Sequence, residues 1–235
     1  MIKKQSVIHI RGAIINDSDR RIYEEYKKSY TSPSDIKLPN QKENIKVIIN
    51  SQGGSVFAGS EIYTMLREYQ GHVTVEIHSI AASIASVIAM AGDTVRISPI
   101  AQIMIHEAST TTTGDTESHK GSINVLDKIN HSIITAYQRK TGLSREKLRQ
   151  MMSEETWMTA QQAKSKGFVD EIMFTDKNNA VLMEDYYKNQ RSQLRVVKQN
   201  SEPKRAFAKL FDSQNKQNTA QTSDPKRAFT KFFGL

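Results

Sequence analysis

Cysteine is absent from this 235-residue sequence, which excludes disulfide scaffolds, thiolate metal sites and a cysteine nucleophile. Any covalent catalysis must therefore use another side chain. Apolar runs are short, and none approaches the roughly 18 residues that a membrane-spanning helix needs. The first residues lack the apolar stretch and the cleavage site of a secretory signal. We therefore expect a cytoplasmic protein with no membrane association, and we expect neither a metal nor a cofactor.

The formal net charge is +8, but most of the chain has no excess of basic over acidic residues. Residues 1–185 hold 22 basic and 22 acidic side chains, whereas residues 186–235 hold 11 basic and 3 acidic side chains. The whole excess thus belongs to the C-terminal part. This distribution argues against nucleic-acid binding by the body of the protein and makes the charge a property of a tail.

Strand-like and helix-like segments alternate through the first 175 residues, which predicts a parallel sheet in an α/β fold. Predicted strands are 7–10, 45–49, 73–77, 94–97, 103–105 and 168–174. Predicted helices are 58–69, 83–90, 122–140, 144–152 and 159–165. The helix at 83–90 is apolar on nearly all faces, so we expect it to be buried. Gly142 is a candidate C-cap, and Thr159 with Gln162 forms a candidate capping box.

The composition changes after about residue 185, where Gln, Asn, Ser and Lys dominate. We predict a folded domain at 1–178 and a mostly disordered basic tail at 179–235. Two tail segments repeat, SEPKRAFAKLF at 201–211 and SDPKRAFTKFF at 223–233. Each begins like a helix and places apolar residues at i, i+3 and i+4, so we expect short helices that dock into a groove. The tail could instead be a cleavable solubilising segment, or it could contact nucleic acid or a membrane surface.

Three predicted strands end in residues with useful chemistry, and the carboxyl ends of parallel strands meet at one edge of a sheet. One strand runs into Gly53 and Gly54, where the backbone turns sharply and presents bare N–H groups. Ser83 lies at the start of the buried helix, and His106 directly follows another strand. A nucleophilic serine needs a base, an orienting carboxylate and N–H donors for the tetrahedral intermediate. These residues and the Ile84 amide supply all but the carboxylate.

The same residues also have purely structural explanations. A small residue packs well early in a buried helix, a histidine at a strand end bonds to a backbone carbonyl, and a glycine pair turns the chain. Ser86, one helical turn after Ser83, is interpreted as a packing residue. The residue pattern alone therefore leaves the catalytic interpretation open.

At these positions the sequence resembles the Clp protease (ClpP-like) family of serine peptidases, and in particular its phage head-maturation, or prohead protease, branch. NSQGGSV at 50–56 is similar to the family's NSPGGSV, with Gln52 in place of proline. AASIA at 81–85 resembles the segment around its nucleophile, and IMIH at 103–106 resembles its histidine motif. SVIAMAGD at 86–93 and ETWMTA at 155–160 are similar to the phage branch. The similarity covers about residues 6–175.

The resemblance implies a role for each candidate residue. Ser83 and His106 would be catalytic, and Glu155 would be the acid, one methylene longer than the aspartate of cellular members. Glu154 and Asp170 are the competing acids. The oxyanion hole would be formed by the backbone amides of Gly54 and Ile84, and the substrate would contact Gly53, Ser55 and Ala108.

The resemblance further implies a ClpP/crotonase-like ββα spiral with a handle, formed here by residues 107–121 and the helix at 122–140. Relatives assemble into homo-oligomeric rings, so we expect a heptamer or a tetradecamer. With this resemblance, we expect the tail to dock on a capsid or scaffold protein or on the protein's own ring.

The implied function is a serine endopeptidase that processes phage capsid or scaffold precursors, in the host cytoplasm or within proheads. The first predicted strand begins almost at Met1, without the preceding segment by which cellular members meet an unfolding ATPase. We therefore expect self-sufficient processing rather than ATP-dependent general degradation. Two further functions compete with the peptidase: a crotonase-like acyl-CoA enzyme, which has no need for a Ser83–His106 pair, and an inactive structural ring protein.

Overall fold

The computed structural model describes residues 6–39 and 42–175. The chain divides into two units, residues 1–174 and 175–235. The predicted tail, its two repeats and the predicted domain boundary after residue 178 lie outside the described residues.

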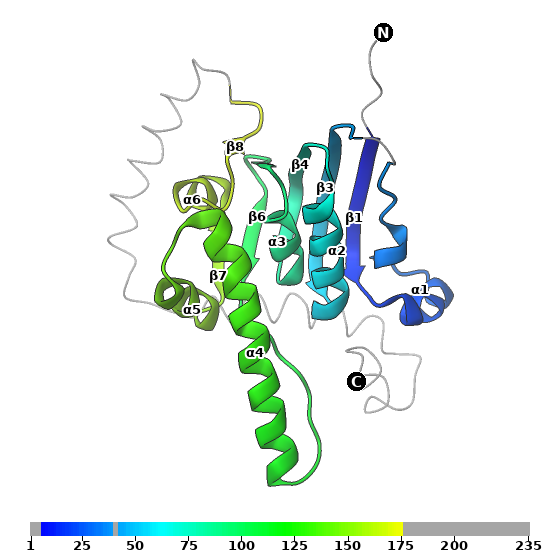
Figure 1. Ribbon diagram of the computed structural model, residues 1–235, viewed down its shortest axis with the longest axis vertical. Helices are drawn as coiled ribbons and strands as arrows, with labels where there is room; N and C mark the ends of the chain where they lie inside the picture. Colours follow the sequence, from blue (N-terminus) through cyan, green and yellow to red (C-terminus); the bar gives the residue numbers. More distant parts are fainter. Residues whose placement is uncertain (1–5, 40–41, 176–235) are drawn as a thin grey trace. The chain divides into compact units, whose positions relative to one another are not determined.

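A mostly parallel sheet forms the centre of the first unit (Figure 1). Its strands are β1 (Ser6–Ile14), β2 (Tyr30–Thr31), β3 (Ile45–Gly54), β4 (Val73–Ala82), β5 (Thr94–Ile97), β6 (Gln102–Ile105), β7 (Thr156–Thr159) and β8 (Glu171–Ile172). They are ordered β2-β1-β3-β4-β5-β8, and β6 pairs with both β4 and β7. Every pairing is parallel except that of β6 with β7. The predicted parallel α/β sheet is therefore confirmed.

Six α-helices are found in the described residues. They are α1 (Arg20–Glu25), α2 (Val56–Glu68), α3 (Ile84–Ala89), α4 (Thr116–Thr141), α5 (Arg145–Ser153) and α6 (Ala160–Ser165). The expected capping box is present at α6, where the Thr159 side chain accepts from the Gln162 N–H. Gly142 ends α4 in the left-handed conformation, with φ 70°, as expected for a C-cap.

Several elements differ from the sequence-based expectation, and helix α1 and strand β2 were not predicted. Helix α4 begins at Thr116 rather than at residue 122, because the Asp115 side chain accepts from the Ser118 N–H and starts the helix earlier. The strand predicted at 168–174 is reduced to β8, and strand β7 was not predicted. Strand β7 is the element that positions one side of the candidate site.

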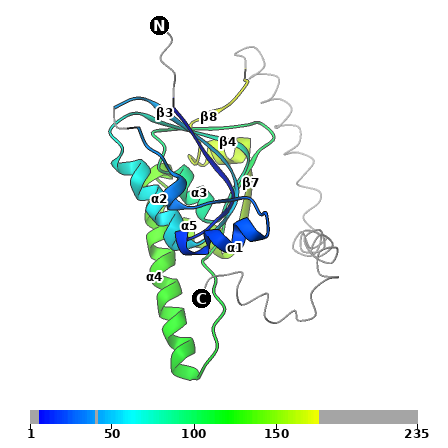
Figure 2. The ribbon, with the colours of Figure 1, turned by 90° about the vertical axis from the view of Figure 1, so that its right-hand side faces the viewer.

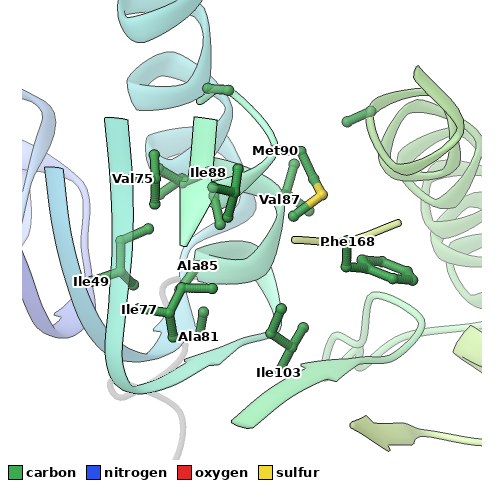
Figure 3. Packing of buried hydrophobic residues seen from close by; sticks show 14 of the residues in the cluster. Ile49, Val75, Ile77, Ala81, Ala85, Val87, Ile88, Met90, Ile103 and Phe168 are labelled. Carbon is green, nitrogen blue, oxygen red and sulfur yellow. The ribbon is translucent and has the colours of Figure 1, made fainter. Parts of the chain in front are cut away.

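The core lies between β3, β4 and the short helix α3, whose six residues are all buried, as predicted. Figure 3 shows Ile88 and Val87 of α3 lying between Val75 of β4 on one side and Phe168 on the other. Burying one such isoleucine or valine side chain contributes about 1.5–3 kcal/mol. The packing therefore fixes the position of α3, and with it the turn that precedes α3.

The handle is formed by α4 and the residues that precede it. The buried residues of α4 all lie in its C-terminal half: Ile133, Ile134, Ala136 and Tyr137. In the N-terminal half, Ile123 and Val125 are 59% and 52% exposed. Figures 1 and 2 show this half extending beyond the sheet. No helix of the described residues combines the length and apolar character needed to cross a bilayer.

Candidate active site

Ser83 alone forms the turn between β4, which ends at Ala82, and α3, which begins at Ile84. Its backbone has φ 54° and ψ −131°, a conformation that residues with a side chain rarely adopt. The Ser83 N–H donates to the Met104 carbonyl of β6 at 3.0 Å. A sharp strand-to-helix turn of this kind presents a serine hydroxyl at the edge of the sheet.

His106 follows β6 directly, and its Nε2 lies 2.8 Å from Ser83 Oγ. Strands β4 and β6 are paired at Ala82 and Met104, so the residues just beyond their carboxyl ends are brought together. Burial lowers the pKa of His106, while the nearby Glu155 carboxylate acts in the opposite direction. The lowered pKa favours the neutral imidazole, whose Nε2 can accept the Ser83 proton.

Glu155 is brought to this edge by the antiparallel pairing of β6 and β7. The last paired residues are Ile105 and Thr156, so His106 and Glu155 are the next residues along the two strands. The Glu155 backbone also has a positive φ, 49°. Within the described chain, the hydrogen bond found for its carboxylate comes from Trp157 Nε1 at 3.3 Å, not from His106. Glu155 therefore acts on His106 through its charge in this structure.

The two competing acids have other partners. Asp170 accepts hydrogen bonds from the Val95 N–H and from Lys140 Nζ, both at 2.7 Å, and so joins β5 to α4. Glu154 accepts a hydrogen bond from Gln150 Nε2 at 2.9 Å. Among the residues that the structure describes, neither acid is found in contact with His106, whereas the charge of Glu155 acts on the pKa of His106.

The end of β3 passes directly against the serine. A Cβ added to Gly53 would lie 2.7 Å from the Ser83 Cβ, so only glycine fits there. The Ser55 N–H donates to the Ile14 carbonyl of β1 at 2.7 Å. In the ladder between β1 and β3, Gly54 is paired with Ile14. The Ile84 N–H is the first of α3 and has no partner within that helix.

The other residues expected to bind substrate are tied to the scaffold. Ser55 caps α2, since its Oγ accepts from the Ala58 N–H at 3.4 Å and donates to Asn16 Oδ1 at 2.8 Å. The Ala108 N–H donates to Asn130 Oδ1 of α4 at 2.8 Å. The roles of Asn16 and Asn130 could not be predicted from the sequence, because each side chain contacts a residue far away along the chain.

No three histidine, aspartate or glutamate side chains of the described residues gather in a way that could hold a metal ion. The site combines a serine hydroxyl and an imidazole at the edge of an α/β sheet, beside the glycines that end β3. This combination is typical of serine hydrolases.

Residues 34–176 match the family model described as Clp protease, and the chain belongs to this family. It is 33% identical, over 147 residues, to the ATP-dependent Clp protease proteolytic subunit 1 of Chlamydia abortus; the match covers 60% of this chain and 75% of that protein. It is 30% identical, over 142 residues, to the ATP-dependent Clp protease proteolytic subunit of Deinococcus radiodurans. This second match covers 60% of this chain and 70% of that protein. The predicted membership of the Clp protease family is confirmed, and the family implies serine peptidase activity.

Proposed function

We propose that the protein is a serine endopeptidase in which Ser83 is the nucleophile and His106 the general base. The observation that carries this proposal is the 2.8 Å contact between Ser83 Oγ and His106 Nε2 on a strained strand-to-helix turn. Strained backbone and a serine–histidine hydrogen bond together are features that catalysis uses.

In this mechanism Ser83 Oγ attacks the carbonyl carbon of the scissile peptide while its proton passes to His106 Nε2. The tetrahedral intermediate collapses when His106 gives this proton to the leaving amine, and the acyl group stays on Ser83. Water then attacks the acyl group, and its proton passes to Nε2. When this second tetrahedral intermediate collapses, the bond between the acyl carbon and Ser83 Oγ breaks, Nε2 returns the proton to Oγ, and the new carboxyl terminus leaves. Glu155 stabilises the imidazolium that exists between these proton transfers, because its charge raises the pKa of His106.

The negative charge on the tetrahedral oxygen is stabilised by the Gly54 and Ile84 N–H groups. Removing one such donor typically costs about 10²–10³ in rate. Gly53 and Ala108 flank the pair, since one lies against Ser83 and the other follows His106 by two residues. We assign these two residues to substrate binding. We assign Ser55 to the same region because it directly follows β3 and is fixed there by its hydrogen bond to Asn16.

The proposed substrates are capsid or scaffold precursors of a phage, cleaved in the host cytoplasm or within proheads. Support comes from the resemblance of 86–93 and 155–160 to the prohead branch. The named relatives are subunits of ATP-dependent proteases, which favours general degradation as the second candidate. Cleavage of a purified coat or scaffold polypeptide, with and without a Clp ATPase and ATP, distinguishes the two.

We further propose that the protein forms a homo-oligomeric ring, as a heptamer or a pair of heptamers. Membership of the Clp protease family supports this, since the family forms homo-oligomeric rings. The projecting half of α4 also leaves Ile123 and Val125 exposed, where another subunit could cover them. Native mass measurement of the full chain is expected to give seven or fourteen times the 26.6 kDa chain mass. A monomer at micromolar concentration would contradict the proposal.

Labelling with a fluorophosphonate tests the catalytic assignment. We expect the label on Ser83, no label after His106→Ala, and unchanged labelling after Ser60→Ala, which alters an exposed serine of α2.

The reaction needs neutral His106, whose pKa is lowered by burial, so the labelling rate should be half-maximal below pH 6.5 and fall as the pH decreases. Glu155→Gln should slow labelling and move this midpoint to lower pH, because the charge that raises the pKa is removed.

Two outcomes of this experiment would contradict the proposal. Labelling of Ser83 that persists in His106→Ala would show that the pair does not act together. No labelling in the assembled protein would favour the acyl-CoA enzyme or the inactive ring protein.

A further inference from the structure

A buried hydroxyl pair lies directly behind the candidate nucleophile. Ser86 of α3 is completely buried, and its Oγ lies 2.6 Å from the Ser83 carbonyl oxygen. The same Oγ lies 2.7 Å from the hydroxyl of Tyr137, a residue of α4 that is 1% exposed. Three oxygen atoms, from two helices and the turn, thus form a continuous chain.

The direction of these hydrogen bonds follows from the chemistry of the groups. A carbonyl oxygen only accepts, so the Ser86 O–H donates to the Ser83 carbonyl. One hydroxyl has one proton, so Ser86 Oγ must accept from the Tyr137 O–H. Burial raises the pKa of Tyr137, which keeps its hydroxyl protonated and able to donate. The order is therefore Tyr137 to Ser86 to the Ser83 carbonyl.

The carbonyl at the end of this chain belongs to the same peptide group as the Ile84 N–H. A trans peptide is planar, so its C=O and N–H point in opposite directions, and fixing one fixes the other. The Ser83 carbonyl accepts hydrogen bonds from Ser86 Oγ and from the Ser86 N–H, the latter at 3.0 Å. Donors aimed at the carbonyl also polarise the peptide, which strengthens its N–H as a donor.

We propose that Ser86 and Tyr137 are positioning residues that orient and polarise the Ile84 N–H as an oxyanion donor. This inference rests on the proposed peptidase function. The Tyr137 ring packs edge-on against Phe168, with centroids 5.6 Å apart at 60°, so the hydroxyl is held in place. Because Tyr137 lies on α4, the handle helix is connected through hydrogen bonds to the peptide group beside the nucleophile.

A purely structural role would have the two hydroxyls only satisfy each other inside the core. Paired substitution separates the two roles. Ser86→Ala leaves the Tyr137 hydroxyl buried without its partner, and Tyr137→Phe leaves Ser86 without a donor. The double variant removes both polar groups, which can restore stability because no buried hydroxyl is left unpaired. A structural role predicts that activity recovers together with stability, whereas a positioning role predicts that it does not.

The test measures three quantities on the full-length protein: kcat and KM for a fluorogenic peptide, the inhibition constant of a peptide boronate, and the unfolding temperature. The boronate forms a tetrahedral adduct on serine, so it needs the Ile84 N–H, whereas ground-state peptide binding does not. We expect Ser86→Ala to lower kcat and weaken boronate binding by about tenfold each, less than the loss of a whole donor. KM should change little.

Tyr137→Phe should give a smaller loss in the same two quantities, about threefold, because Ser86 still donates to the carbonyl. The double variant should match Ser86→Ala in kcat even if its unfolding temperature returns toward that of the unmodified protein. Ser132→Ala is the matched control, since the hydrogen bond found for this exposed hydroxyl of α4 within the described residues goes to the Lys128 carbonyl of the same helix. It should leave every quantity unchanged.

Unmodified kcat and boronate affinity in Tyr137→Phe and in the double variant would overturn the inference. Equal weakening of peptide and boronate binding would also overturn it, since that indicates general loosening of the site. If Ser86→Ala fails to fold, Tyr137→Phe and the double variant still distinguish the positioning role from the structural role. Failure of the peptidase proposal itself is recognised separately, by activity that does not depend on Ser83.

Discussion

Ser83→Ala is expected to lower kcat for peptide cleavage by about 10⁵–10⁶, because a peptidase that loses its nucleophile keeps only the contribution of binding and of the oxyanion donors. KM should change little, since alanine removes only the hydroxyl. The measurement is steady-state cleavage of a fluorogenic peptide by the full-length protein.

Two further variants make this prediction specific. His106→Ala should cost about as much as Ser83→Ala, and the double variant should cost no more than either alone, because the two groups act as a unit at 2.8 Å. Ser60→Ala should be indistinguishable from the unmodified protein. A Ser83→Ala variant that retains more than a few per cent of the activity would exclude Ser83 as the nucleophile.

The sheet and the serine–histidine neighbourhood could be predicted because both follow from local patterns. Strands β3 and β4 carry β-branched runs that end in distinctive residues, and parallel strands bring their carboxyl ends to one edge. Helix α3 was recognisable from its apolar sequence. The start of α4 was not, since its first turns are polar and its apolar periodicity begins only at Ile123.

The residues around the pair were harder to foresee because their contacts are long-range. Strand β7 has four residues and is defined by pairing with β6, which no local periodicity reports. The only tryptophan of the chain, Trp157, lies two residues after Glu155, but its hydrogen bond to that carboxylate depends on β7 being a strand. Ser86 was interpreted as packing, yet it bonds to Tyr137, 51 residues away in the sequence.

The second substitution with a large expected effect is at Gly54, the last residue of β3. Gly54 has φ 151°, a value that favours glycine, and an added Cβ would overlap the Ile14 carbonyl oxygen of β1. Ile14 and Gly54 are paired in the ladder between β1 and β3, so the overlapping atom is backbone and cannot move aside cheaply. Relief of the overlap requires the end of β3 to shift.

Gly54→Ala is therefore expected to lower the free energy of unfolding by about 2–4 kcal/mol, through backbone strain and lost pairing with β1. It should also lower kcat/KM by about 10² or more, since the displaced Gly54 N–H no longer meets the oxyanion. Urea unfolding and peptide cleavage measure the two effects. Gly121→Ala is the matched control, because its Cβ would meet nothing within 4 Å and the site lies inside α4.

The control should gain about 0.5–1 kcal/mol in stability, as alanine is the better helix former, with no change in cleavage. Because the two substitutions add the same methyl group, their difference isolates the geometry of the β3 turn. A Gly54→Ala variant that unfolds normally but has lost cleavage would assign Gly54 to the oxyanion hole rather than to the scaffold. One that keeps full cleavage would remove the Gly54 amide from the proposed mechanism, whatever its stability.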